Sequence, residues 1–272
     1  MANSAGARFD ALLSLMARLR GAGGCPWDRE QTRASLKPCL VEETYEVLQA
    51  IDEGDTEHLA EELGDLLFQV VFHCQVASEA GEFSMTDVIE RLIGKMTRRH
   101  PHVFGDQVVT DAREALAQWE RIKHGEGSRQ GEPRSALDGG PGSLPALLRA
   151  QRLQEKAGRV GLDWTNREDA WRKVREEIAE TDEALDGGNA ERIRDELGDV
   201  LFSLVNVARL QGIDAEDCLR QAADKFTRRF KEVEADMMAG GRTVSEASAE
   251  DLDKAWETVK AREPRDPFGT GR

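Results

Sequence analysis

The chain has 272 residues and a formal net charge of −15, with 37 basic against 52 acidic side chains. This length suffices for one or two domains that each bury a core. The acidic excess argues against a nucleic-acid polymer as partner, because such binding depends on Lys and Arg neutralising phosphates. The longest apolar stretch, residues 66–72, is far shorter than the ~20 residues of a membrane span, so no membrane segment is expected. Four cysteines without a C-x-x-C pair disfavour a zinc site or disulfide framework and predict a cytoplasmic location.

Apolar residues recur along the chain at spacings of three and four, which is typical of amphipathic helices. In the first half this pattern predicts helices over residues 8–20, 36–52, 59–74, 85–99 and 111–123. In the second half it predicts helices over residues 144–157, 168–186, 193–208, 214–238 and 249–262. Residues 125–143 carry six glycines and two prolines and predict a linker. We therefore expect an all-α chain with an N-terminal helical domain (1–124), this linker, and a C-terminal helical domain (144–272).

The two carboxylate motifs of the first half recur in the second half at one offset of 134 residues. Glu43 and Glu46 align with Glu177 and Glu180 at this offset. The run Glu62-Leu63-Gly64-Asp65 aligns in the same way with Glu196-Leu197-Gly198-Asp199. Farther on, the basic run at residues 95–99 matches residues 225–229 at an offset of 130. Self-similarity of this kind indicates a tandem duplication.

Each half carries E-E-x-x-E on one predicted helix and E-x-x-D on the next. Residues three apart share a helix face, and a short turn makes the two helices antiparallel neighbours. Four carboxylates can then converge, which is how helical bundles build metal sites. Oxygen ligands of this kind suit Mg²⁺, with Mn²⁺ as a substitute. The candidate metal ligands are Glu177, Glu180, Glu196 and Asp199 in the second half and Glu43, Glu46, Glu62 and Asp65 in the first.

The alternative interpretation of these acids is a solvated, charged helix face. Three features count against it. The carboxylates border the apolar stripe, and the arrangement occurs twice. In addition, Gly64 and Gly198 lie inside their helices, where a glycine costs about 1 kcal/mol relative to alanine. Such a glycine predicts the close approach of a backbone or a ligand.

Basic residues on the following helix suit a polyphosphate, which needs both metal ions and positive donors. In the second half Lys225, Arg228 and Arg229 share one helix face. A basic patch that only balances nearby acids is the alternative. Trp256 fits either stacking on a base or a place in the core. Other phosphate chemistries are poorly supported, because the sequence has neither a G-x-x-x-x-G-K-[ST] loop nor a G-x-G-x-x-G turn.

Together these motifs resemble the MazG family of all-α nucleoside triphosphate pyrophosphohydrolases. The resemblance covers nearly the whole chain. Besides the carboxylate motifs, it rests on five segments: Gly24-Cys25-Pro26-Trp27-Asp28, Glu62-Leu63-Gly64-Asp65-Leu66-Leu67-Phe68, Arg98-Arg99-His100-Pro101-His102-Val103-Phe104, Ser143-Leu144-Pro145-Ala146-Leu147 and Val160-Gly161-Leu162-Asp163-Trp164.

The resemblance implies that the chain hydrolyses nucleoside triphosphates to the monophosphate and pyrophosphate, with Mg²⁺ and broad base tolerance, in nucleotide-pool housekeeping. It also implies a homodimer whose helices form four-helix bundles. Glu177, Glu180, Glu196 and Asp199 would bind Mg²⁺. The triphosphate would contact Lys173, Arg192, Lys225, Arg228 and Arg229, with Trp256 near the nucleotide. From the chemistry of the reaction we expect a water to attack the α-phosphorus, with the non-ligating carboxylate of Glu176 as the candidate that orients this water.

The surroundings of the carboxylates differ between the halves. At the offset of 134 residues, Lys173 aligns with Cys39, Arg192 with His58 and Asn206 with Phe72. These polar and cationic groups lie on the helix faces of the second half's carboxylates, so we predict that the second half is the stronger catalyst. The alternative function is a non-catalytic helical module whose acidic faces bind a basic partner. It predicts no dependence on a metal ion.

Overall fold

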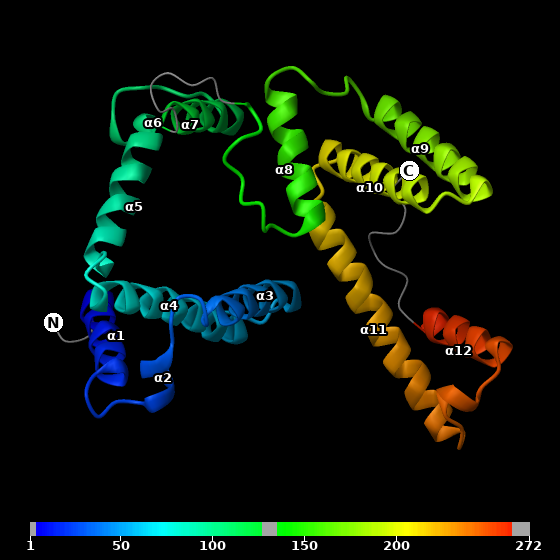
Figure 1. Cartoon of the computed structure of the whole chain (residues 1–272), viewed down its shortest axis with the longest axis horizontal. Coiled ribbons are helices and arrows are strands. Elements are labelled where there is room, and N and C mark those ends of the chain that lie inside the picture. Colours follow the sequence, from blue (N-terminus) through cyan, green and yellow to red (C-terminus); the bar gives the residue numbers. More distant parts are fainter. Residues whose placement is uncertain (1–3, 127–134, 263–272) are drawn as a thin grey trace. The chain divides into compact units, whose positions relative to one another are not determined.

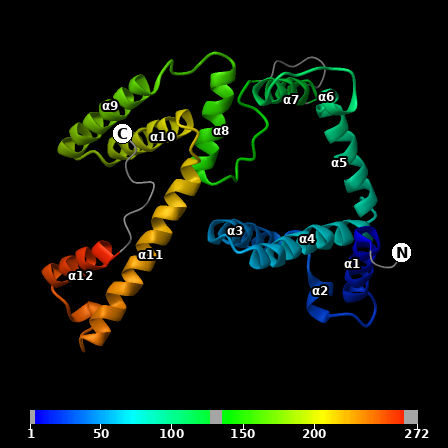
Figure 2. The ribbon, with the colours of Figure 1, turned by 180° about the vertical axis from the view of Figure 1, so that it is seen from behind.

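The structure is a computed structural model, and it describes residues 4–126 and 135–262. Within these ranges the chain is all-α and contains no strand. It divides into two compact units, Met1–Gly131 and Glu132–Arg272 (Figures 1 and 2). None of the described helices combines the length and the apolar composition needed to cross a bilayer.

All ten predicted helices are present. The N-terminal unit contains α1 (Ala5–Arg20), α2 (Pro26–Glu30), α3 (Lys37–Glu53), α4 (Thr56–Glu79), α5 (Met85–Arg99), α6 (Pro101–Phe104) and α7 (Ala112–Glu126). The C-terminal unit contains α8 (Ala146–Arg159), α9 (Arg167–Gly187), α10 (Ala190–Leu210), α11 (Ala215–Ala239), the 3₁₀ turn η1 (Val244–Glu246) and α12 (Ala249–Arg262). The predicted linker at residues 125–143 stays a prediction, since its residues 127–134 lie outside the described ranges.

The repeated carboxylate motifs lie on two helix pairs, α3 with α4 and α9 with α10, that are joined by the same kind of turn. Gly54 and Gly188 end the first helix of each pair in the left-handed conformation, at φ of 70° and 68°, which glycine adopts without strain. Asp55 and Asn189 then cap the second helix by accepting hydrogen bonds from its first backbone N–H groups. The chain thus reverses within a few residues, and the two helices of each pair pack along one another.

The buried core of the N-terminal unit lies where α1 packs against α4. Met16, Leu36, Val71 and Phe72 form a cluster from which solvent is almost completely excluded. In the C-terminal unit, α12 packs against α11 through Val233, Met237 and Val259, and α11 also contacts η1 and α8.

A stripe of large apolar side chains on each helix pair is left exposed. Leu63 and Leu197, which are equivalent in the repeat, are 50% and 49% exposed. The apolar stripe comprises Val41, Tyr45, Leu48, Ile51, Leu63, Leu67 and Val70 on α3 and α4, and Trp171, Ile178, Leu185, Leu197, Leu201, Phe202 and Leu204 on α9 and α10. Where such side chains adjoin one another on a soluble protein, they are typical of an interaction surface.

The helix-interior glycines Gly64 and Gly198 face open space. A Cβ atom placed on either one meets no atom of the described residues within 4 Å, apart from the helix's own nearby backbone. None of the described residues of this chain therefore makes the close approach that these glycines predict.

Candidate metal centre

Three of the four predicted ligands in the second half converge between α9 and α10. Glu177, Glu196 and Asp199 each place one carboxylate oxygen within 4.8 Å of the others. Glu177 is buried, Glu196 is half-buried and Asp199 is exposed, so the cluster opens to solvent on one side. Glu180 lies outside this group of three. Burial raises the pKa of Glu180, and the charge of the neighbouring Glu177 raises it further.

Two cations already contact this C-terminal cluster. The Lys173 ammonium lies 2.6 Å from a carboxylate oxygen of both Glu176 and Glu177, and these contacts raise the pKa of Lys173 above its ordinary value. The Arg192 guanidinium lies 3.4 Å from Glu196. Both cations are thus placed on the ligand face, as their spacing of four residues before Glu177 and Glu196 predicts.

The first half repeats the arrangement between α3 and α4, where Glu43, Glu62 and Asp65 converge within 4.8 Å. Glu46, the fourth predicted ligand, is exposed and lies outside the three. Burial raises the pKa of Glu43, and the neighbouring acids Asp65 and Glu46 raise it further, against a hydrogen bond from Gln69. The carboxylates of this N-terminal cluster therefore lie close together without full charge compensation.

Within the part of the chain that the structure describes, the N-terminal cluster is contacted by an amide and an imidazole, in place of the lysine and arginine of the C-terminal cluster. The Gln69 amide donates to Glu43 at 3.3 Å, and its own Oε1 is buried without a hydrogen-bond partner. His58 lies 3.0 Å from Glu62 and 3.2 Å from Glu53. Sequence reasoning missed Gln69, although its place four residues after Asp65 puts it on the ligand face.

Both clusters fit a divalent cation. Three carboxylates from two facing helices supply a hard, all-oxygen donor set. Carboxylates held this close repel one another unless a cation lies between them. The orphaned Gln69 oxygen beside Glu43 adds a buried polar atom that needs a partner.

The remaining predicted residues lie elsewhere. Glu176 is exposed and accepts a hydrogen bond from Lys173. Lys225, Arg228 and Arg229 lie on α11. On α12, Trp256 packs against the apolar cluster of Val233, Met237 and Val259. Its ring centroid lies 5.2 Å from that of Phe226 and 6.0 Å from the guanidinium carbon of Arg229. The contact of these side chains with a triphosphate stays a prediction.

Comparisons with known proteins support the resemblance. The family model described as "MazG nucleotide pyrophosphohydrolase domain" matches residues 31–104 and 166–234, which contain the two carboxylate clusters. The chain belongs to the MazG family. It is 46% identical over 259 residues to the nucleoside triphosphate pyrophosphohydrolase of Escherichia coli (strain K12), an alignment that covers 94% of this chain and 98% of that protein.

Two further relatives are similar over the same share of this MazG-family chain. It is 45% identical to the nucleoside triphosphate pyrophosphohydrolase/pyrophosphatase MazG of Thermotoga maritima, with 94% of this chain and 97% of that protein covered. It is also 45% identical to the uncharacterized protein YabN of Bacillus subtilis, with 94% of this chain but 52% of that protein covered. The match to both repeats shows that the chain is a tandem of two MazG domains.

One MazG-family motif, Val160-Gly161-Leu162-Asp163-Trp164, has a structural role here. Asp163 accepts hydrogen bonds from Arg209 near the end of α10, which lowers the pKa of Asp163. Arg209 also donates to Asn206 at 2.7 and 2.9 Å. Asn206, predicted to be a polar group on the ligand face, is thus engaged in tying the loop after α8 to α10.

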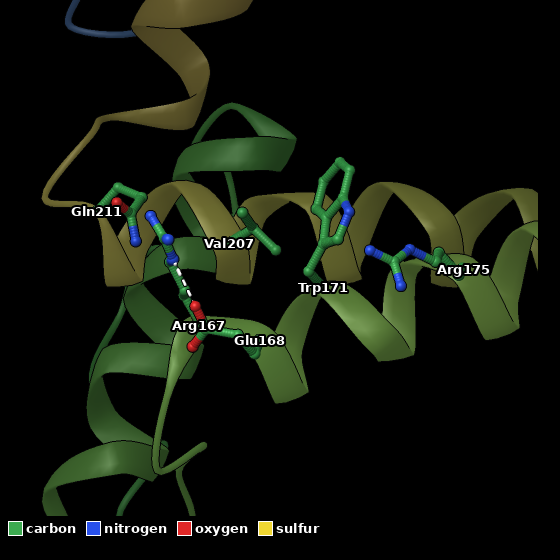
Figure 3. Close-up of a pocket in the computed structure, with 6 residues that line it drawn as sticks. All are labelled: Arg167, Glu168, Trp171, Arg175, Val207 and Gln211. Atoms are coloured by element: carbon green, nitrogen blue, oxygen red, sulfur yellow. Dashed lines mark hydrogen bonds and ion pairs between the residues drawn. The ribbon is translucent and has the colours of Figure 1, made fainter. Parts of the chain in front are cut away.

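A pocket of about 530 Å³ lies between the first turns of α9 and the last turns of α10. It is lined by Arg167, Glu168, Trp171, Arg175, Val207 and Gln211, and none of these is a predicted site residue. Figure 3 shows Trp171 and Arg175 projecting from α9, and it marks the ion pair between Arg167 and Glu168. Sequence reasoning missed this Trp–Arg pair, although its i, i+4 spacing predicts a shared face.

Proposed function

We propose that the chain is a Mg²⁺-dependent nucleoside triphosphate pyrophosphohydrolase with broad base tolerance and a housekeeping role in the cytoplasm. The observation that carries the proposal is the convergence of Glu177, Glu196 and Asp199 beside Lys173 and Arg192. The activity named for the two similar proteins of E. coli and T. maritima supports the reaction.

In the proposed reaction, water attacks the α-phosphorus, a new P–O bond forms, and the bond to the pyrophosphate oxygen breaks. Mg²⁺, when bound, supplies the Lewis acidity that offsets the phosphate charge and makes a water acidic enough to attack. Glu177, Glu196 and Asp199 would hold it, with Glu180 beside them.

The cationic and acidic side chains around the cluster have separate roles in this proposal. Lys173 and Arg192 donate to phosphate oxygens and stabilise the charge that develops on the leaving pyrophosphate. Lys225, Arg228 and Arg229 add further donors, and Trp256 lies near the nucleotide. Glu176 orients the attacking water and accepts its proton, because it is exposed on the turn that carries Lys173 and Glu177.

We further propose that a second copy of the chain covers the apolar stripe of each helix pair. A single pair of helices cannot cover all of its own apolar surface. Two such pairs can pack their apolar surfaces against each other and form a four-helix bundle. The equivalent positions of the stripe in both repeats, with Leu63 matching Leu197 and Leu67 matching Leu201, support the same packing in both domains. The open space at Gly64 and Gly198 gives such a neighbour room to approach.

An assay of pyrophosphate release from several nucleoside triphosphates, with and without Mg²⁺, tests the activity. We expect release only with Mg²⁺, and we expect Glu196→Gln to lower kcat at least ~100-fold, because the loss of a carboxylate ligand weakens the binding of the Mg²⁺ that offsets the phosphate charge. The matched variant Glu62→Gln in the first repeat should retain most of the activity.

Circular dichroism of both variants checks that they remain folded. Activity that survives Glu196→Gln and disappears with Glu62→Gln would place catalysis in the first half. No pyrophosphate release from any nucleotide would favour the non-catalytic acidic module instead.

A further inference from the structure

The two acidic clusters have nearly the same geometry but different counter-charges. In the C-terminal cluster, Lys173 contacts Glu177 at 2.6 Å and Arg192 contacts Glu196 at 3.4 Å. At the equivalent positions the N-terminal cluster has Cys39, which carries no positive charge, and His58, whose imidazole lies 3.0 Å from Glu62. Gln69 supplies a neutral hydrogen bond to Glu43, whereas its equivalent Ser203 donates to the backbone of its own helix.

These counter-charges matter because a divalent cation competes with them for the same carboxylates. A cation that approaches Glu177 and Glu196 meets repulsion from the permanent positive charges of Lys173 and Arg192. At Glu43 it meets an amide, and the unpartnered Gln69 oxygen lies beside it. Among the described residues, the carboxylates of the first cluster are thus contacted by a titratable imidazole and a neutral amide, whereas those of the second are already paired with two permanent cations.

Lys173 and Arg192 are also free to move to another anion. Their side chains are 35% and 49% exposed, while the Glu177 side chain is only 7% exposed. When a ligand binds, the long cationic side chains can therefore reorient, whereas the buried carboxylate stays in place. A triphosphate that arrives with its divalent cation gives both side chains a new partner and relieves their repulsion with that cation.

We propose that the two repeats bind divalent cations in different states: the N-terminal cluster without nucleotide, and the C-terminal cluster only together with a nucleoside triphosphate. Lys173 and Arg192 act as built-in counter-ions that leave the carboxylates for the phosphates. This inference rests on the proposed function for the identity of the nucleotide. By thermodynamic linkage, the cation and the nucleotide then strengthen each other's binding in the second half and not in the first.

Mn²⁺ binding to the full-length protein, measured by titration calorimetry, tests the proposal. Without nucleotide we expect one tight binding event per chain that Glu62→Gln removes and Glu196→Gln leaves unchanged. With a nucleotide analogue whose α–β bridge is a methylene group and resists hydrolysis, a second tight event should appear, and Glu196→Gln should remove it. Equal Mn²⁺ affinity of the two clusters without nucleotide would overturn the proposal.

Exchange of the counter-charges tests the cause. Lys173→Met should raise the Mn²⁺ affinity of the C-terminal cluster about tenfold in the absence of nucleotide. Repulsion between a partly exposed unit charge and a nearby cation changes the binding constant by roughly this factor. Cys39→Lys should lower the affinity of the N-terminal cluster by a similar factor. The control Lys254→Met removes an exposed lysine that pairs with Glu250 on α12 and should change neither affinity.

An unchanged Mn²⁺ affinity in Lys173→Met would overturn the assigned role of the lysine. A failure of the proposed function and a failure of this inference give different results. Absent pyrophosphate release contradicts the hydrolase, whereas the nucleotide-free Mn²⁺ titrations test the counter-charges without any reaction.

Discussion

Lys173 shows how far single residues of the site could be predicted. Its place four residues before Glu177 predicted a shared helix face, and the structure confirms that it lies beside this carboxylate. That it also contacts Glu176 at 2.6 Å depends on the rotamers of three long side chains, which the spacing does not determine. The spacing of Gln69, Trp171 and Arg175 gives their helix faces, but which of these faces line a cluster or a pocket is decided by the packing of one helix on the next.

Arg20 and Glu79 give a pH-dependent prediction at the residue scale. Arg20 at the end of α1 donates three hydrogen bonds to the Glu79 carboxylate of α4, at 2.7, 3.0 and 3.1 Å, and its guanidinium lies over the Phe72 ring. The hydrogen bonds from Arg20 hold the pKa of Glu79 below its ordinary value. The stabilisation by this pair is therefore fully present above the unfolded-state pKa and is lost as the pH falls through the folded-state pKa.

We expect Glu79→Gln to lower the free energy of unfolding by about 1 to 2 kcal/mol at pH 7, the range of a charge-assisted hydrogen bond that is partly exposed. Urea unfolding of both proteins at pH 7 and below pH 4 measures the difference. The two stabilities should converge in acid. A difference that stays constant over this range would contradict the assigned pair.

At the scale of helices, periodicity identified every long element, because the apolar residues on the buried face of an amphipathic helix recur at spacings of three and four. The elements it missed, α2, α6 and η1, are five, four and three residues long, too short to show a period. The structure also divides the predicted stripe of α4 into two parts. Val71 and Cys74 are buried, whereas Leu63 and Leu67 are exposed.

The exposed part of this stripe predicts how the helix pairs associate. We expect the double variant Leu67→Glu/Leu201→Glu to convert a dimer into a monomer, because each substitution buries an unpaired charge in the proposed bundle interface. Light scattering coupled to size exclusion should then give half the mass of the unmodified protein. Leu219→Glu is the control, since Leu219 is 56% exposed on α11 and lies outside the stripe. A wild-type chain that is already a monomer would contradict the prediction.

At the scale of the whole molecule, the duplication was visible in the sequence because both motifs and the turn between them keep one spacing of 134 residues. The match of the family model to both repeats confirms it. The sequence predicted convergence of four carboxylates in each half, while the structure brings three within 4.8 Å and leaves Glu46 and Glu180 outside. Spacing along a helix predicts on which face of the helix a residue lies. Whether its carboxylate reaches the cluster depends on the burial of the side chain and on the charges nearby.

The most direct test of the central claim is the fate of the attacking water's oxygen. The full-length protein is given a nucleoside triphosphate and Mg²⁺ in water enriched in ¹⁸O, and mass spectrometry locates the label in the products. Attack at the α-phosphorus predicts one ¹⁸O atom in the nucleoside monophosphate and none in the pyrophosphate. Label in the pyrophosphate, or products that are a nucleoside diphosphate and inorganic phosphate, would contradict the account.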